Sequence, residues 1–392
     1  MISRELSKEI IPLLHFFPCV AIIGSRQVGK TTFVKNLQEL VNKPILYLDL
    51  EDQNDYEIIS NNAQWFLTQH KDKLVIIDEI QREIKLFPLL RSLIDKQDQA
   101  GQFILLGSAS PELLAKSSET LAGRIIYKEL TPLTHFETLQ YDFKNHWFRG
   151  GYPKAFLAPT DYLWQQWHQA YLKTYVETDL RMLGLNASPI LISKLLRMIA
   201  SIQGSVINYS MLGNALGISS VQVKNYIDFL EHSFIIRRLE PFFINVGKRL
   251  VKSPKIYIRD TGMLHSLLQI NSYDELVANV VAGNSWEGYV IEQIISRLNS
   301  NCIPYFYRTQ SGAEVDLCIT KGNEIIATVE IKLSNTPKIS RGNNESVSDL
   351  KTISNFVVTF DHSDYRLNEN WKVCDLQTLY KDLEFLNLTR KP

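Results

Sequence analysis

The first group of residues suited to phosphate chemistry is the run Gly24-Ser25-Arg26-Gln27-Val28-Gly29-Lys30-Thr31, which lies between an apolar segment and a helical pattern. Glycines at its first and sixth positions allow the backbone to turn successive N–H groups inward, and the following helix N-terminus adds partial positive charge. Lys30 is expected to reach the β- and γ-phosphates of ATP, and the Thr31 hydroxyl to ligate Mg²⁺. The pattern therefore predicts a nucleotide-binding P-loop, which we extend to Thr32.

A second polar group follows the apolar run Leu74–Ile77, which ends in Asp78 and Glu79. Beside a P-loop, Asp78 would complete the Mg²⁺ site and Glu79 would polarise the attacking water. The next apolar run ends in Ser108. Ser108 is expected either to contact the γ-phosphate or to cap a helix that begins near Pro111, and the sequence leaves both roles open.

A third group lies near the C-terminus, in two stretches that alternate polar and apolar residues. Glu314 and Asp316 share one strand face, and Glu330 and Lys332 share another. A hairpin would bring Asp316, Glu330 and Lys332 together, and Glu287 at the start of a helix adds a third carboxylate. We interpret Glu287, Asp316 and Glu330 as ligands of a second Mg²⁺, with Glu330 and Lys332 catalytic against a phosphodiester. A solvated lattice of ion pairs on an exposed sheet is the alternative.

These residues need a framework that positions them. In the first third of the chain, short apolar runs alternate with helical spacing, which is typical of a parallel sheet covered on both faces. We expect strands at Cys19–Ile23, Ile45–Leu50, Leu74–Asp78 and Phe103–Leu106, and helices at Thr31–Val41 and Phe87–Ile94.

The middle of the chain predicts a helix-turn-helix. A short helix from Asn208 ends at a glycine turn, Ser219 is the expected N-cap, and Ser220–His232 forms the second helix. Strands at Phe234–Leu239 and Ile256–Arg259 would complete a winged helix.

A basic stretch follows the second of these helices. Seven basic residues stand against one acidic residue there: Arg237, Arg238, Lys248, Arg249, Lys252, Lys255 and Arg259, against Glu240. Such a stretch is typical of phosphate contact and indicates DNA as a partner. A packing or protein-contact module is the alternative.

Composition limits the class of protein. The chain has 392 residues, of which 45% are hydrophobic and 21% charged, as expected of a globular protein with several domains. Its 42 basic and 42 acidic residues exclude a uniformly basic coat for nucleic acid, but not a local basic patch. The cysteines form no CxxC pair, which predicts a reducing, cytoplasmic setting. The apolar runs are too short to span a bilayer, so we expect no membrane partner.

Several short strings, taken in order, resemble a bacterial family of AAA-type P-loop ATPases of poorly defined role. The strings are GSRQVGKTT, IIDEIQ, GSAS, ETLAGR, GGYP, YVETDL, KRLVKSPKIYIRDTG, EVDL and VEIK, and they extend over nearly the whole chain. The resemblance implies an AAA-type core in which Arg124 contacts the γ-phosphate, in cis or from a neighbouring subunit. A surface or helix-capping role is the alternative for Arg124. Many AAA proteins are ring oligomers, so a homo-oligomer is implied as well, without a subunit count.

Members of that family carry a C-terminal domain of unknown function with a nuclease-like core. In this chain Asp316, Glu330 and Lys332 resemble the hallmark positions of the PD-(D/E)xK nuclease superfamily, and Glu287 resembles its helical acid. No proline precedes Asp316, which departs from that pattern. The resemblance implies the fold, whereas activity is a separate question because a fold does not carry activity with it.

The expected architecture is α/β with four regions. These are a P-loop AAA-type ATPase core at 1–130, a helical lid or linker at 131–205, a winged helix-turn-helix-like module at 206–262, and an α/β PD-(D/E)xK nuclease-like domain at 263–392. The leading hypothesis is an ATP- and Mg²⁺-dependent ATPase coupled to DNA binding and to metal-dependent DNA cleavage. The alternatives are a nucleotide-switched DNA-binding or protein-binding regulator in which the nuclease-like domain is inactive.

Overall fold

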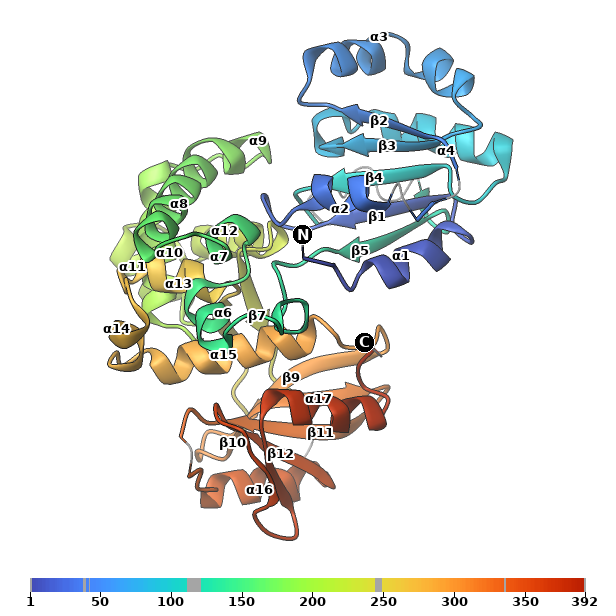
Figure 1. Cartoon of the computed structure of the whole chain (residues 1–392). Helices are drawn as coiled ribbons and strands as arrows, with labels where there is room; N and C mark the ends of the chain where they lie inside the picture. Colours follow the sequence, from blue (N-terminus) through green and yellow to red (C-terminus); the bar gives the residue numbers. More distant parts are fainter. Residues whose placement is uncertain are drawn as a thin grey trace.

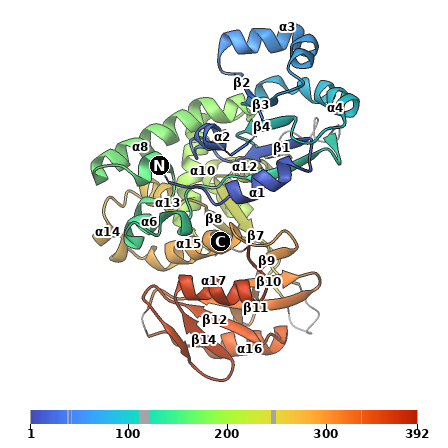
Figure 2. The same cartoon turned by 45° about the vertical axis from the view of Figure 1, so that its right-hand side comes forward.

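The computed structural model describes residues 2–37, 40–41, 43–110, 121–243, 249–334 and 336–390. Within these residues the strands form a five-stranded, a six-stranded and a three-stranded sheet. The five-stranded and six-stranded sheets lie at opposite ends of the molecule, and the middle helices and the three-stranded sheet lie between them (Figure 1). A view turned by 45° shows the same arrangement (Figure 2).

The N-terminal sheet is wholly parallel, with the strand order β2-β3-β4-β1-β5. Its strands are β1 (Cys19–Ile23), β2 (Ile45–Asp49), β3 (Leu74–Asp78), β4 (Phe103–Gly107) and β5 (Ile125–Glu129). Its helical segments are α1 (Ser7–Leu14), α2 (Lys30–Leu37), α3 (Gln53–Gln69), η1 (Ile80–Glu83) and α4 (Leu86–Gln97). The predicted parallel sheet is confirmed, and β4 lies between the strands that end at the P-loop and at Asp78.

Helices cover both faces of this sheet, as the uninterrupted apolar strands predict. On one face Val20 and Ile22 of β1 belong to the same buried cluster as α1 and α2. On the other face Cys19 and Ala21 pack with α3 and α4. Successive side chains of β1 thus pack into two separate buried clusters, one on each face of the sheet.

The middle of the chain is mainly helical. Its elements are η3 (Phe136–Thr138), α6 (Phe143–Arg149), α7 (Pro153–Phe156), α8 (Asp161–Thr174), a π-helical turn η4 (Tyr175–Asp179), α9 (Leu180–Met182), α10 (Pro189–Ser201), β6 (Ser205–Val206), α11 (Tyr209–Leu216), α12 (Ser220–His232), β7 (Ile236–Leu239), β8 (Lys255–Ile258), α13 (Thr261–Leu267) and α14 (Tyr273–Val277). Strands β6, β8 and β7 form an antiparallel sheet in that order.

Helices form at both places where the sequence predicts them in this region, as α11 and α12. Gly217 ends α11 in a left-handed conformation, and Ser219 caps α12 through a capping box with Gln222. The two expected strands also pair, as β7 and β8.

The C-terminal part is a six-stranded sheet with helices on both sides. Its elements are α15 (Ala282–Ile295), β9 (Cys302–Arg308), β10 (Glu314–Lys321), β11 (Glu324–Ile331), α16 (Arg341–Leu350), β12 (Ser354–Val358), β13 (Asp364–Arg366), β14 (Trp371–Cys374) and α17 (Leu376–Phe385). Strands β10 and β11 form the predicted antiparallel hairpin. Helices α15 and α17 share one buried cluster with the sheet, and α16 packs on its other face.

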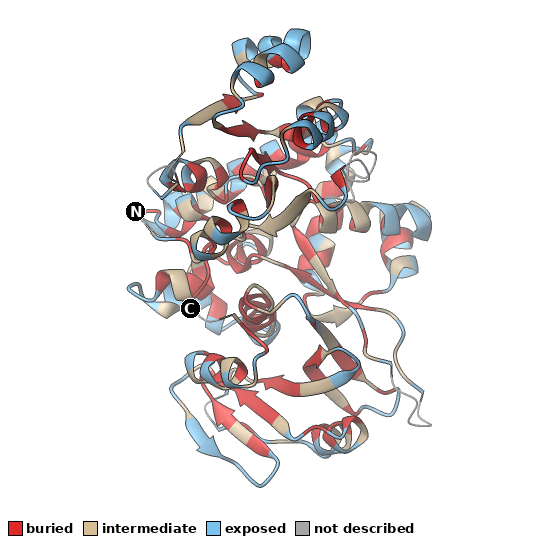
Figure 3. Cartoon of the chain, turned by 90° about the vertical axis from the view of Figure 1, so that its right-hand side faces the viewer, coloured by how far each residue is buried: buried red, intermediate tan, exposed pale blue. Residues whose placement is uncertain are grey.

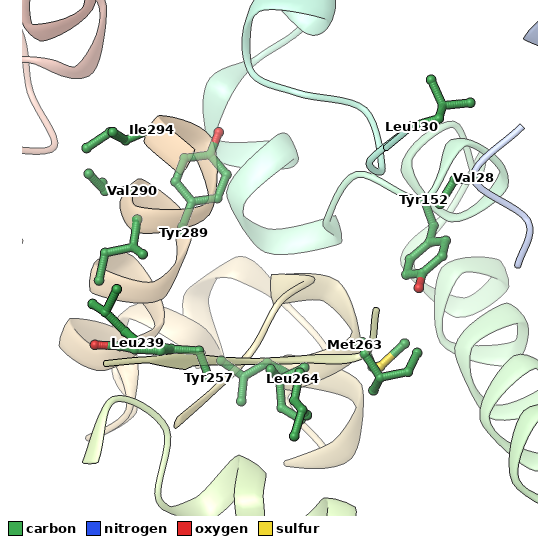
Figure 4. Packing of buried hydrophobic residues seen from close by; sticks show 14 of the residues in the cluster. Val28, Leu130, Tyr152, Leu239, Tyr257, Met263, Leu264, Tyr289, Val290 and Ile294 are labelled. Atoms are coloured by element: carbon green, nitrogen blue, oxygen red, sulfur yellow. The ribbon is translucent and has the colours of Figure 1, made fainter. Parts of the chain in front are cut away.

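The largest buried cluster continues across all three parts of the molecule. Buried residues lie in the N-terminal sheet, in the middle helices and in the C-terminal sheet (Figure 3). Leu239 of β7 and Tyr257 of β8 lie beside α15, which contributes Tyr289, Val290 and Ile294 to the same buried cluster (Figure 4). The parts are therefore joined by a shared core.

Two further expectations concern the chemistry of the whole chain. All four cysteines are free and buried, so no disulfide is formed. Within the described ranges, no helix has the length and apolar character needed to cross a membrane.

Candidate functional site

The predicted P-loop connects β1 to α2. Gly24 and Gly29 have φ values of +153° and +96°, and a Cβ on Gly24 would lie 2.3 Å from the carbonyl oxygen of Leu130. These two positions therefore require glycine. Arg4 supports the loop from outside, because its guanidinium donates to the Val28 carbonyl at 2.9 Å.

Lys30 lies inside the loop. Its side chain is buried, and its ammonium donates to the carbonyls of Gly24 and Ser25 at 2.9 and 3.1 Å and to Ser108 Oγ at 3.1 Å. Burial lowers the pKa of Lys30 to about 8, although Glu79 and Asp78 oppose the shift. The lysine and the serine that follow two neighbouring strands, β1 and β4, are thus brought into direct contact.

The Asp78 carboxylate accepts three hydrogen bonds. Thr31 Oγ1 donates to its Oδ2 at 2.7 Å, and Tyr47 on β2 donates to the same oxygen at 2.6 Å. The Glu79 N–H donates to Asp78 Oδ1 at 2.9 Å. A hydroxyl and a carboxylate in contact are hard oxygen ligands of the kind that Mg²⁺ prefers, so the residues present fit this ion.

Glu79 takes a left-handed conformation with φ +55° and ψ +45°, which is uncommon for a residue other than glycine. Its carboxylate lies 3.5 Å from Ser108 Oγ and accepts a hydrogen bond from Gln81. Burial raises the pKa of Glu79, which Lys30 opposes. The alternative role of Ser108 as a helix cap concerns residues 111–120, which lie outside the described residues.

The middle region contacts the P-loop directly. Arg26 is paired with Asp179 of η4 and with Glu51, and the Arg26–Glu51 distance is 2.5 Å. Tyr152 donates to Ser25 Oγ at 3.1 Å. Of the remaining predicted P-loop residues, Val28 has a buried side chain, whereas Gln27 and Thr32 are exposed.

Arg124 does not lie beside the P-loop. Its carbonyl accepts from the N–H of Cys19, the first residue of β1, whereas the P-loop follows the last residue of that strand. At about 3.3 Å per residue, five residues separate these positions by about 16 Å. The Arg124 side chain is paired with Asp95 at 2.5 Å. Arg124 is therefore not placed to contact the γ-phosphate within its own chain; the exposed pair with Asp95 fits the alternative of a surface arginine, and a contact from a neighbouring subunit stays a proposal.

The C-terminal carboxylates gather around a lysine that sequence reasoning placed elsewhere. The ammonium of Lys255 lies 3.0 Å from Glu287, 2.9 Å from Glu314 and 3.4 Å from Asp316. Tyr257 also donates to Glu287 at 2.6 Å. The sequence predicts Glu287 at the start of its helix, but the residue lies in the interior of α15.

Glu330 and Lys332 complete this group, which we call the carboxylate cluster: Lys255, Glu287, Glu314, Asp316, Glu330 and Lys332. Lys332 lies 2.6 Å from Glu330. Burial raises the pKa of Glu330, and the nearby Asp316 raises it further. Glu330 is only 4% exposed and Asp316 only 7%, so the alternative of a solvated lattice of ion pairs is wrong.

A β-bulge sets the direction of Asp316. The pairing of β10 with β9 shifts between Val315 and Cys318, so Val315 and Leu317 belong to different buried clusters. The regular polar and apolar alternation that the sequence predicts from Glu314 onward is therefore interrupted at this bulge. Asp316 accepts from the backbone N–H of Ile331 at 2.9 Å, which holds it against β11.

The basic stretch is mostly neutralised. Lys255 lies in the carboxylate cluster, and three of the arginines are paired with acidic side chains: Arg237 with Glu292, Arg238 with Asp228 and Glu231, and Arg259 with Glu129 and Glu292. Lys248 lies outside the described residues, and Arg249 and Lys252 are exposed. The continuous basic surface that the sequence predicts is therefore reduced, within the described residues, to two exposed cations.

Sequence reasoning missed the roles of Tyr47, Tyr152, Asp179 and Lys255. Tyr47 lies on a strand adjacent to β3, but no motif marks it. Tyr152 and Asp179 lie in the strings GGYP and YVETDL, which carried a resemblance but no assigned role. Both residues are far from the P-loop in the sequence, so the sequence alone does not indicate that they contact it. The structure shows these contacts, from Tyr152 to Ser25 and from Asp179 to Arg26.

Comparisons with known proteins divide the chain into three parts. Residues 17–139 match an AAA domain, residues 140–274 match a domain of unknown function named DUF8612, and residues 282–379 match a domain of unknown function named DUF4143. The AAA match bears out the resemblance in the N-terminal part. No activity is attached to the other two descriptions.

Two curated relatives are similar over most of the chain. They are uncharacterized proteins of Mycobacterium tuberculosis and Mycobacterium bovis, and each is 36% identical over 348 residues, which is 89% of this chain and 78% of the relative. Among solved structures, the Walker-type ATPase of Pyrococcus abyssi has 15% identity and a TM-score of 0.46 over 68% of this chain and 96% of its own. The replication initiator DnaA bound to AMPPCP and single-stranded DNA has 16% identity and a TM-score of 0.33 over 59% and 90%. With these scores, neither structure carries an argument about this chain.

The place of Arg124 gives a prediction. Arg124→Ala should leave the Kd for ATP within about twofold of wild type, because the side chain lies at the opposite edge of the sheet from the P-loop and makes an exposed ion pair. The measurement is titration of a fluorescent ATP analogue at protein concentrations low enough to keep the chain monomeric. Lys30→Ala is the positive control. A tenfold loss of affinity in Arg124→Ala would contradict the placement.

Proposed function

The chain, which matches an AAA domain and two domains of unknown function, belongs to the same family as the two mycobacterial proteins, and we propose that it is a Mg²⁺-dependent ATPase that acts as a switch. The observation that carries the proposal is the contact between Thr31 and Asp78 beside a buried Lys30 and a Glu79 directed at Ser108. Metal ligands, a phosphate-binding cation and a candidate base thus meet at one edge of the sheet.

The roles follow from this geometry. Lys30 would exchange its carbonyl partners for the β- and γ-phosphates, and the backbone N–H groups of residues 24–31 would bind the phosphates from the other side. Thr31 and Asp78 would hold Mg²⁺, which neutralises charge on the phosphates. Glu79 would orient the attacking water and Ser108 would contact the γ-phosphate. Lys30 and Glu79 are therefore the proposed catalytic residues of hydrolysis.

The middle region supports a switch. Ser25 and Arg26 are held by Tyr152 and Asp179, and the N–H of Ser110, in the loop after Ser108, donates to the carbonyl of His232 at 2.9 Å. His232 is the last residue of α12, the second helix of the proposed DNA-contacting pair. A change at the phosphates therefore has a short route to that helix.

DNA is the proposed target of the switch. The order of α10, β6, α11, α12, β7 and β8, with the sheet order β6-β8-β7, supports a winged helix. The exposed Arg249 and Lys252 lie against the end of β9, since Gln310 and Val251 form backbone hydrogen bonds across this boundary. They remain available for phosphates. A protein partner for the same surface is the alternative.

Metal-dependent DNA cleavage is a second candidate function. The observation that favours it is the gathering of Glu287, Asp316, Glu330 and Lys332 at one place, where Glu330 Oε2 is buried and accepts no hydrogen bond of normal geometry. Such an oxygen fits a cation ligand. The Lys255 ammonium among the same carboxylates favours instead a regulator whose nuclease-like domain is inactive.

The first test concerns ATP. Lys30→Ala should weaken ATP binding by about 10- to 100-fold, because the phosphates lose a charge-assisted partner. Glu79→Gln should bind ATP normally but slow hydrolysis by about 10²- to 10⁴-fold, since its shape is kept and the base is lost. Phosphate release and nucleotide titration measure the two effects. Equal hydrolysis rates in wild type and Glu79→Gln would refute the role of Glu79.

The second test concerns DNA. The double variant Arg249→Glu, Lys252→Glu should weaken DNA binding and flatten the dependence of log K on log salt by about two units, one for each phosphate that is no longer neutralised. Fluorescence anisotropy at several salt concentrations gives both values. The matched control, Lys85→Glu with Lys96→Glu, makes the same charge change on exposed positions of the ATPase sheet. If both double variants behave like wild type, this surface does not contact DNA.

The third test concerns cleavage. Glu330→Gln should abolish Mn²⁺-dependent cleavage of DNA and leave ATP hydrolysis unchanged, because Glu330 lies in a different sheet from the P-loop. Single-stranded, duplex and branched DNA are the substrates. Wild-type protein that cleaves none of them would support the inactive, binding role of this domain.

A further inference from the structure

Lys255 is the central cation of the carboxylate cluster. Its side chain is 3% exposed, and its ammonium lies within 3.4 Å of three carboxylates, those of Glu287, Glu314 and Asp316. The ammonium donates hydrogen bonds to Glu287 and Asp316 and forms an ion pair with Glu314.

The same place has features of a metal site that is not assembled. Glu330 Oε2 is buried near Asp316 and accepts no hydrogen bond of normal geometry, although the Asn343 side chain lies close enough to lower the pKa of Glu330. Yet no three His, Cys, Asp or Glu side chains in the described part of the chain are placed to hold a metal ion. The carboxylates stand around an ammonium at 2.9–3.4 Å, whereas Mg²⁺ would draw its oxygen ligands to about 2.1 Å.

Lys255 does not belong to the C-terminal sheet that supplies Asp316 and Glu330. It is the first residue of β8, in the three-stranded sheet. Along the same strand Tyr257 donates to Glu287, and Arg259, just beyond the strand, is paired with Glu292 of α15 and Glu129 of β5. The position of Lys255 therefore depends on how β8 packs against α15 and the ATPase sheet.

We propose that Lys255 is a built-in cation that occupies the carboxylate cluster in place of a divalent metal, so that the cluster binds a metal tightly only when this ammonium is removed. The proposal rests on the second candidate function for the location of the site, but it concerns metal binding and not cleavage. A divalent ion and the ammonium compete because both need the same oxygens of Glu287 and Asp316 and repel each other at short range.

The test is Mn²⁺ binding to the full chain without nucleotide, followed by the decrease of the free-ion signal in electron paramagnetic resonance. All proteins carry Thr31→Ala, so that the P-loop does not contribute a second site. Lys255→Met keeps the apolar stem of the side chain, ends one atom short of the ammonium position and removes the charge. It should bind one Mn²⁺ per chain at least about tenfold more tightly than the Thr31→Ala parent, and adding Glu330→Gln should reverse the gain.

The matched control is Arg308→Met. Arg308 lies 3.4 Å from Glu314, on a half-exposed side chain, and does not lie between the carboxylates. Arg308→Met removes one positive charge near the cluster, as Lys255→Met does, but it frees none of the oxygens of Glu287 and Asp316. It should therefore leave the Mn²⁺ affinity within about threefold of the parent. An equal gain in both variants would show that Mn²⁺ responds to net charge, and would overturn the proposal.

Removal of the lysine also leaves buried carboxylates uncompensated, so a second measurement protects against misfolding. Mn²⁺ should raise the thermal midpoint of Lys255→Met and of the milder Lys255→Gln, but not that of the parent. Two results would overturn the proposal: Glu330-dependent Mn²⁺ binding that is as tight in the parent as in the variants, or no Mn²⁺ binding in any of them. Neither result depends on ATP hydrolysis. Tight Mn²⁺ binding by the Lys255 variants without any DNA cleavage would count against the second candidate function alone.

Discussion

The buried Arg259 guanidinium is the group on which the relative placement of the three parts depends. Its side chain is 8% exposed, and it is paired with Glu129 at the end of β5 and with Glu292 on α15. Arg237 of β7 shares Glu292. Removal of one partner from such a buried group leaves an uncompensated charge, at a cost of about 3–5 kcal/mol. The shared apolar core brings the parts together, and this ionic group fixes the orientation, because the guanidinium hydrogen bonds to Glu292 and Glu129 are directional.

A feature of this arrangement can be predicted from the sequence when the residues that determine it lie close together along the chain. The P-loop and the strand that ends at Asp78 could be predicted because each is written in one short segment. The boundaries of α12 were also predictable, since Ser219 and Gln222 form a local capping box. The position of Arg124 could not be predicted, because its short motif does not indicate at which end of the parallel strands the residue lies.

Lys255 shows the other limit. In the sequence it is one of several cations in a row, and that pattern indicates a surface that binds phosphate. In the fold, its side chain meets carboxylates from α15 and β10, which are separated from it by tens of residues. The bulge before Cys318 could not be predicted for a similar reason. The sequence of β10 alternates regularly, but the pairing of this strand with β9 shifts in register. Both depend on tertiary contacts that composition and period do not contain.

The π-helical turn η4 between α8 and α9 has a consequence for how this family can vary. A π turn holds one residue more than an α turn, so it is equivalent to a single-residue insertion in a continuous helix. Asp179 is the last residue of that turn and contacts Arg26 of the P-loop. Deletion of one residue from the turn would restore regular α geometry and leave the helix beyond the turn on the same face, because the extra residue is accommodated within the turn. Asp179 lies inside the turn, so the helix would survive such a deletion while the carboxylate lost its present contact with Arg26.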